Sequence, residues 1–442
     1  MENLPTPTPI PDPPLPDRAE RRASIQLAIF SGIGMLGLVI RAAVLVAFTG
    51  MSLVGAGQAA GPEFAATILD ASSMLFCALL LVPALVYSLR RLKGREVRPL
   101  AIPPVRAGAL ALLVAAWVAA LVLWTVLTLL FDFGWAVAAP FFLLGVALPV
   151  AGLTWIGIGG LTSGSRRRLW ATLALGMVGG VGLAIVAEYL VFLLVGLAGG
   201  VAMLANPELA ALVEELGRQI ENAGDIQAMM VILAPYLTNP LVFLALLSFV
   251  AGIGPVIEEI AKPLAVLVLG KRLHTPAEGF ALGALCGAGF ALLEGLMAAS
   301  GTVEMWGLGL LGRAVSSLMH ITASGLMGWG YASARLEKRY GRLLLLFLLA
   351  VAIHGLWNGS ALTAVYGALL TVADPARPNP LGLLVMLAGL GTLALMLPTM
   401  LAALPLLNRR LQPAASPAPG TPVPPVPDPL PPAPEATPPM RP

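Results

Sequence analysis

The chain has 442 residues, of which 58% are hydrophobic and 11% are charged, and its formal net charge is +3. Soluble globular domains carry about 25% charged residues, so this composition excludes a soluble protein and predicts a polytopic membrane protein. The basic residues are spread along the chain as membrane topology would place them, so we expect no nucleic-acid partner.

Proline-rich segments at the two ends, residues 1–24 and 412–442, predict disordered or extended tails. Between them we expect an all-α transmembrane helix bundle of about ten spans, each with about 20 or more mainly apolar residues. The expected spans are 25–49, 63–89, 107–131, 135–163, 170–200, 239–270, 278–300, 307–334, 344–371 and 381–407.

Basic residues alternate between the loops in a way that supports this topology. They gather before the first span, in every second loop and after the last span: Arg18, Arg21 and Arg22; Arg90, Arg91, Lys93, Arg95, Arg98 and Arg106; Arg166, Arg167 and Arg168; Lys271 and Arg272; Arg335, Lys338, Arg339 and Arg342; Arg409 and Arg410. The opposite loops carry only Arg218 and Arg377. By the positive-inside rule, both termini are expected in the cytoplasm.

The chain divides into regions of different character. A first group of five spans, residues 25–200, holds few polar residues. An acidic external loop follows at 201–238, where apolar residues recur at helical spacing from Leu209 to Ile220. This spacing predicts an amphipathic helix on the membrane surface, which could gate lateral entry of a substrate or simply cover the bundle. The second membrane region, residues 239–407, carries the candidate chemistry.

Ionisable residues inside these later spans are candidates for function. The segment Glu258-Glu259-Ile260-Ala261-Lys262 lies in an apolar run, where each charge costs about 2.5–3.5 kcal/mol on insertion scales. The following three spans carry further polar groups: Glu294, His320, and His354 with Asn358. At 1.5 Å per residue, all of these lie about 15–24 Å from the cytoplasmic end of their spans, near the middle of the membrane. The sequence thus predicts a polar site buried in the bilayer.

Helical spacing predicts how the first of these segments is arranged. Glu258 and Lys262 are i,i+4 neighbours and can pair, whereas Glu259 is turned by about 100° and needs another partner. Gly252, Gly254 and Pro255 come just before them and can kink the helix, which frees backbone carbonyls at a polar cavity.

Several chemical roles are open to this set. Glu258 could deprotonate a water that attacks a peptide carbonyl, and His354 with Asn358 could donate hydrogen bonds to the developing oxyanion. Glu294 and His320 could orient the water or hold a metal. Together with His354 they would form a His₂Glu set, which is a known catalytic zinc type. The spacing does not choose between a zinc-dependent and a metal-free mechanism.

At these residues the chain resembles the PrsW family of intramembrane proteases. The motifs are EExxK at Glu258–Lys262, FxxxE at Phe290–Glu294, a lone mid-span His320, and a final motif that runs from His354 to Asn358, within a resemblance over about residues 239–371. The family is similar to type II CAAX prenyl proteases, which implies Glu258 as the base and His354 with Asn358 as the oxyanion site. Those proteases use histidine at the position of Glu294.

The resemblance also implies a biological setting. It implies a multi-pass protein in the plasma membrane of a prokaryote, surrounded by lipid. Its substrate would be a membrane-anchored protein, such as an anti-sigma factor, that is cut near its external face.

Two other functions use similar residues. A proton-coupled transporter would also keep carboxylates and histidines at the middle of the membrane, and a non-catalytic scaffold would need no intact acid/base set. Other intramembrane charges, Arg41, Asp70 and Glu188, are expected to form helix-packing ion pairs, and Arg313 is expected to be structural.

Overall fold

The computed structural model describes residues 17–56, 62–95, 99–131, 134–223, 226–268, 273–300, 306–372 and 379–412. The expected proline-rich tails fall largely outside these residues, as do Lys271, Arg272 and Arg377. The first helix, α1 (Arg18–Ala56), begins within the stretch expected as tail.

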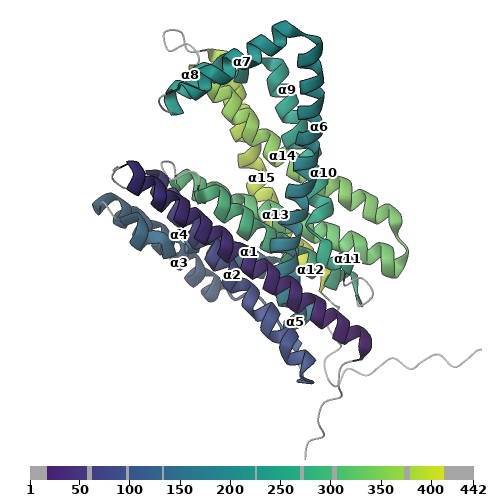
Figure 1. Cartoon of the computed structure of the whole chain (residues 1–442). Helices are drawn as coiled ribbons and strands as arrows, with labels where there is room; N and C mark the ends of the chain where they lie inside the picture. Colours follow the sequence, from purple (N-terminus) through teal and green to yellow (C-terminus); the bar gives the residue numbers. More distant parts are fainter. Residues whose placement is uncertain are drawn as a thin grey trace, which may run out of the picture.

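Four long helices make up the first part of the chain. Helix α1 packs along α2 (Pro62–Leu92), and α3 (Ala107–Leu130) packs along α4 (Gly134–Ile158), so two hairpins lie side by side (Figure 1). The apolar residues of these helices point partly outward, for example Leu112 and Leu129 on α3, as lipid-facing helices require.

The next segment links the two membrane regions. A short strand, β1 (Pro99–Ala101), pairs antiparallel with β2 (Thr162–Ser165), and Arg166 follows directly. Arg166 begins a long helical segment that comprises α5 (Arg166–Ala174), the π-helical turn η1 (Leu175–Gly180) and α6 (Val181–Ala205). In Figure 1, α6 rises away from the first hairpins.

Helices α7 (Pro207–Glu221) and α8 (Ile226–Leu237) lie at the opposite end of the molecule from α5 (Figure 1). Helix α7 covers the amphipathic stretch in the predicted external loop, and none of its residues is buried. Asn206 caps α7 by accepting hydrogen bonds from the backbone N–H groups of Glu208 and Leu209.

The second membrane region consists of one interrupted span and four continuous helices. The interrupted span comprises α9 (Pro240–Ser248), the π-helical turn η2 (Phe249–Ile253), α10 (Gly254–Ala261) and α11 (Leu264–Val268). The continuous helices are α12 (Pro276–Ser300), α13 (Trp306–Glu337), α14 (Tyr340–Val372) and α15 (Pro380–Leu411). Helix α12 lies at the centre and packs against α13, η1, α4, α5 and α2.

The predicted polytopic helical bundle is confirmed. Within the described residues, nine helical segments are long and apolar enough to cross a membrane. The tenth expected span, 307–334, is helical as part of α13 but is not among the nine. This helix is less apolar because it carries buried polar residues, among them Ser317, His320 and Ser324, on faces that pack inside the bundle. The cytoplasmic placement of the termini remains a prediction.

Small residues let α12 and α13 approach closely. A Cβ atom at Gly287 would collide with the backbone carbonyl of His320, and one at Gly283 would collide with that of Ser324. Larger side chains at these positions would push the helices apart. Because glycines stand at these two positions, α13 and its residue His320 lie close to α12.

Candidate active site

Four elements of the second membrane region bring the candidate residues together. Glu258 and Glu259 lie on α10, and Lys262 comes directly after its last residue. Helix α12 carries Glu294, α13 carries His320, and α14 carries His354 and Asn358. All six predicted site residues therefore meet at one place.

The turn before α10 explains how α14 comes so close. Pro255 has no N–H, so the carbonyl of Ala251 cannot receive the usual i−4 helical hydrogen bond. That carbonyl lies against Gly355, where a Cβ atom would collide with it. The neighbouring carbonyl of Val250 accepts a hydrogen bond from Asn358 Nδ2 at 3.4 Å. The π-helical turn before Gly254 thus presents two backbone carbonyls to α14 beside His354.

Glu259, Lys262 and His354 form a buried ionic cluster. Lys262 Nζ donates to Glu259 Oε1 at 2.7 Å, and the same oxygen lies 2.9 Å from His354 Nδ1. Glu259 and Lys262 have no exposed side-chain surface. The further partner that the sequence predicted for Glu259 is present as His354, but Lys262 also reaches Glu259, which the sequence did not predict. The contact with Nδ1 turns the opposite nitrogen, Nε2, toward Glu258.

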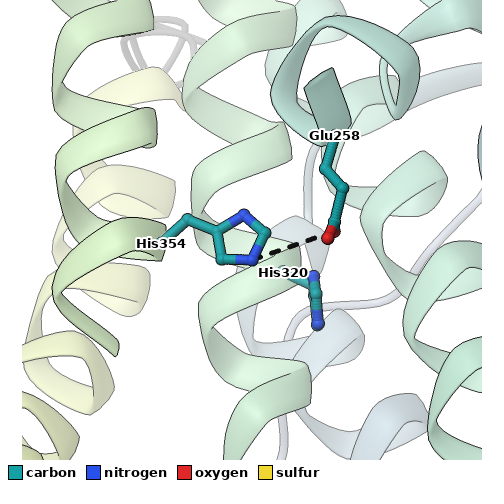
Figure 2. Close-up of side chains that lie close together, drawn as sticks. All are labelled: Glu258, His320 and His354. Atoms are coloured by element: carbon teal, nitrogen blue, oxygen red, sulfur yellow. Dashed lines mark ion pairs between the residues drawn. The ribbon is translucent and has the colours of Figure 1, made fainter. Parts of the chain in front are cut away.

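Glu258 lies between the buried ionic cluster and a cavity. Its Oε2 atom is 2.8 Å from Lys262 Nζ, as the i,i+4 spacing predicted, and 3.8 Å from His354 Nε2. Figure 2 shows the Glu258 carboxylate pointing toward the ring of His354, with His320 close by. The side chain keeps 15% of its surface exposed and lines a cavity. One carboxylate is therefore fixed by a cation yet accessible to water.

His320 has its own carboxylate and its own cation. Glu294 Oε2 lies 2.9 Å from His320 Nε2, and Glu294 Oε1 accepts a hydrogen bond from Arg313 Nη1 at 3.1 Å. The other ring nitrogen, His320 Nδ1, is buried and has no hydrogen-bond partner in the described part of the chain. Arg313, which we expected to be structural, thus belongs to the surroundings of the site.

The two histidines are held in parallel ways. Each ring contacts a glutamate through one nitrogen, and each glutamate is paired with a cation from a nearby position. Histidines that bind metals commonly place their second nitrogen against a carboxylate, which fixes the tautomer and the ring orientation. The rings of His320 and His354 lie edge to face with centroids 5.3 Å apart.

These residues form a group that could hold a metal ion. Glu258, His320 and His354 each offer a ligand atom, and the three atoms lie within 4.8 Å of one another. The expected ligand set contained Glu294 in place of Glu258. Glu294 instead contacts His320 and Arg313. Glu258 thus takes the place that we expected for Glu294 in the donor group.

The chemistry of the donors fits a divalent cation. Two imidazoles and one carboxylate form a catalytic zinc type of ligand set. The buried Nδ1 of His320 has no hydrogen-bond partner among the described residues and is available as a ligand, and Glu258 Oε2, although paired with Lys262, also faces His354. Three glutamates face only two cations here, Lys262 and Arg313, which leaves a formal negative charge for a metal to balance.

Asn358 lies beside the Nε2 nitrogen of His354. Its Nδ2 atom is 3.1 Å from His354 Nε2, one turn away on α14. The shared face of the two residues, predicted from their i,i+4 spacing, is present. An amide donor is thus placed next to the nitrogen that faces Glu258.

A cavity of about 350 Å³ opens beside the site. It is lined by Glu258 of α10, by Phe290 and Glu294 of α12, and by Glu188 of α6. Larger cavities, of about 600 and 770 Å³, lie near Arg167 and between α13, α14 and α15, and the catalytic candidates line neither. Among these three cavities, only the one of about 350 Å³ is lined by candidate catalytic residues.

A comparison with known families identifies a related family. Residues 223–390 match the model of the PrsW family intramembrane metalloprotease. The PrsW resemblance predicted from the motifs is thereby confirmed, over a longer stretch than the expected 239–371. No curated protein and no solved structure gives a significant match. The PrsW match and the spanning helices support an integral multi-pass membrane protein with protease function.

Proposed function

We propose that the protein is a metal-dependent endopeptidase that hydrolyses a peptide bond of a membrane-anchored protein inside the membrane. The observation that carries this proposal is the group of Glu258, His320 and His354, in which each histidine is backed by a separate glutamate. The PrsW match over the same helices supports it.

Glu258 is the proposed base. Its carboxylate lines the cavity, so a water there can give up a proton to it while attacking the substrate carbonyl. Its Oε2 atom faces His354 and would complete the ligand set with the two histidines, so the other carboxylate oxygen, Oε1, would accept the proton. When bound there, a divalent metal supplies a Lewis acid that polarises the carbonyl and makes the water more acidic.

The surrounding residues position these groups. Glu259 holds His354 through Nδ1, and Lys262 holds both glutamates of α10 in place. Glu294 does the same for His320. Asn358 presents an N–H donor next to His354, where it can stabilise negative charge on the substrate oxygen.

The substrate class follows from where the site lies. Glu258, Glu294 and His354 lie on helices that are long and apolar enough to span the membrane, so we infer that the peptide comes from a chain that enters or borders the bilayer. We infer that it is a membrane-anchored protein cut near its external face, such as an anti-sigma factor, in the plasma membrane of a prokaryote. Within this scheme, residues 239–407 form the protease domain, and the five spans of 25–200 and the external loop 201–238 surround it.

Two alternative functions, a non-catalytic scaffold and a proton-coupled transporter, explain fewer of the contacts between the glutamates and histidines of the site. A scaffold needs no set of two histidines with matched carboxylates around a water-accessible glutamate. A proton-coupled transporter would also use such groups, but it does not need each histidine to be backed by its own carboxylate.

Co-expression with tagged single-span membrane proteins tests the function. We expect the wild type to release a fragment, and we expect Glu258→Gln and His354→Ala to release none. His274→Ala is the matched control, because this exposed histidine lies outside the site. Release by Glu258→Gln at the wild-type rate would contradict the proposal.

A further inference from the structure

Glu188 is an intramembrane carboxylate that the proposed mechanism does not use. It lies on α6, outside the PrsW match, and lines the same cavity as Glu258 and Glu294. The sequence suggested a helix-packing ion pair. That is true of Arg41 and Asp70, whose side chains lie 3.2 Å apart, but Glu188 forms no ion pair or hydrogen bond within the described residues.

The cations near the cavity are already engaged. Lys262 contacts Glu258 and Glu259 at 2.8 and 2.7 Å, and Arg313 contacts Glu294 at 3.1 Å. An ionised carboxylate inside a spanning helix is costly, so a cationic group that enters the cavity would stabilise the charged form of the partly buried Glu188. The cavity is the place from which such a group can arrive.

The position of Glu188 relative to Glu258 is defined by α10. Its Oε1 atom would lie 3.8 Å from a Cβ atom at Gly254. Gly254 and Glu258 share a face of α10 one turn apart, about 6 Å along the helix axis. An extended peptide advances about 3.3 Å per residue, so this separation corresponds to roughly two substrate residues.

We propose that Glu188 determines substrate specificity by binding a lysine or arginine side chain about two residues from the scissile bond. This inference rests on the proposed peptidase function. The polypeptide runs from α9 through η2 and Gly254 to Glu258, so Glu188 lies on the α9 side of the catalytic glutamate. With the predicted topology, that is the external side of the cut.

A library of tagged single-span proteins tests this, with the residues at the external membrane border randomised and the released fragments sequenced. For the wild type we expect about tenfold or greater enrichment of Lys and Arg at one position about two residues from the cut. In Glu188→Gln this enrichment should vanish while other sequences are still cut. In Glu188→Lys the preference should change to Asp and Glu.

Asp70→Asn is the matched control, because it removes an intramembrane carboxylate that already has a partner. It should leave the basic preference unchanged. Retention of the basic preference in Glu188→Gln, or its absence from the wild-type profile, would overturn the inference alone. Equal release by wild type and Glu258→Gln would instead overturn the peptidase function, and this inference with it.

Discussion

Replacement of Lys262 by methionine tests the buried ionic cluster. Lys262 and Glu259 have no exposed side-chain surface, and Lys262 also lies 2.8 Å from Glu258. Lys262→Met leaves two carboxylates close together without their cation. Removal of one partner from a buried ion pair costs about 3–5 kcal/mol, so we expect the free energy of unfolding to fall by this amount.

The double variant Glu259→Gln/Lys262→Met identifies the cause. It removes the buried charge of Glu259 together with that of its partner Lys262. The remaining carboxylate, Glu258, still lines the cavity. We therefore expect about half or more of the lost free energy of unfolding to return. Equilibrium unfolding in mixed detergent micelles measures both. Arg218→Met is the control, because it breaks an exposed ion pair with Glu215 and should leave stability unchanged. A double variant as unstable as Lys262→Met would refute the reasoning.

Two further variants test the positioning of the histidines. Gly355→Ala places a Cβ atom against the Ala251 carbonyl and should shift His354, so cleavage should fall about 10- to 100-fold, whereas Gly341→Ala, which meets open space, should cleave normally. Arg313→Leu removes the cation that holds Glu294, so metal affinity in chelator competition should fall about tenfold or more, and Arg313→Lys should restore part of it. Unchanged cleavage by Gly355→Ala would show that the contact of Gly355 with Ala251 does not position His354. Unchanged metal affinity of Arg313→Leu would show that Arg313 does not support the metal site.

The fold could be predicted from the sequence because the membrane imposes long apolar helices with basic loops between them. The exception was α13, where side chains such as Ser317 and His320 face the inside of the bundle and lower the apolar character. Two sequence signals also located local structure correctly. Gly252, Gly254 and Pro255 indicated an irregular helix where the π-helical turn η2 lies, and the apolar spacing from Leu209 to Ile220 predicted α7.

The candidate site residues could be listed from the sequence, but their contacts could not. The donor group contains Glu258 rather than Glu294, because Glu294 contacts Arg313 and His320 Nε2, and these contacts between helices cannot be read from spacing within one helix. Lys262 forms ion pairs with both Glu258 and Glu259, because it lies four and three residues after them at the end of α10. The cavity position of Glu188 depends on how α6 packs against α10, which no local pattern reveals.

The metal content of the purified protein tests the central claim most directly, because it needs no knowledge of the substrate. We expect about one zinc or other divalent metal per chain in the wild type, and less than about a tenth of that in His320→Ala and in His354→Ala. His274→Ala should keep the metal. A metal-free wild type that cleaves at full rate would contradict the metal-dependent account, and so would equal metal loss in all three variants.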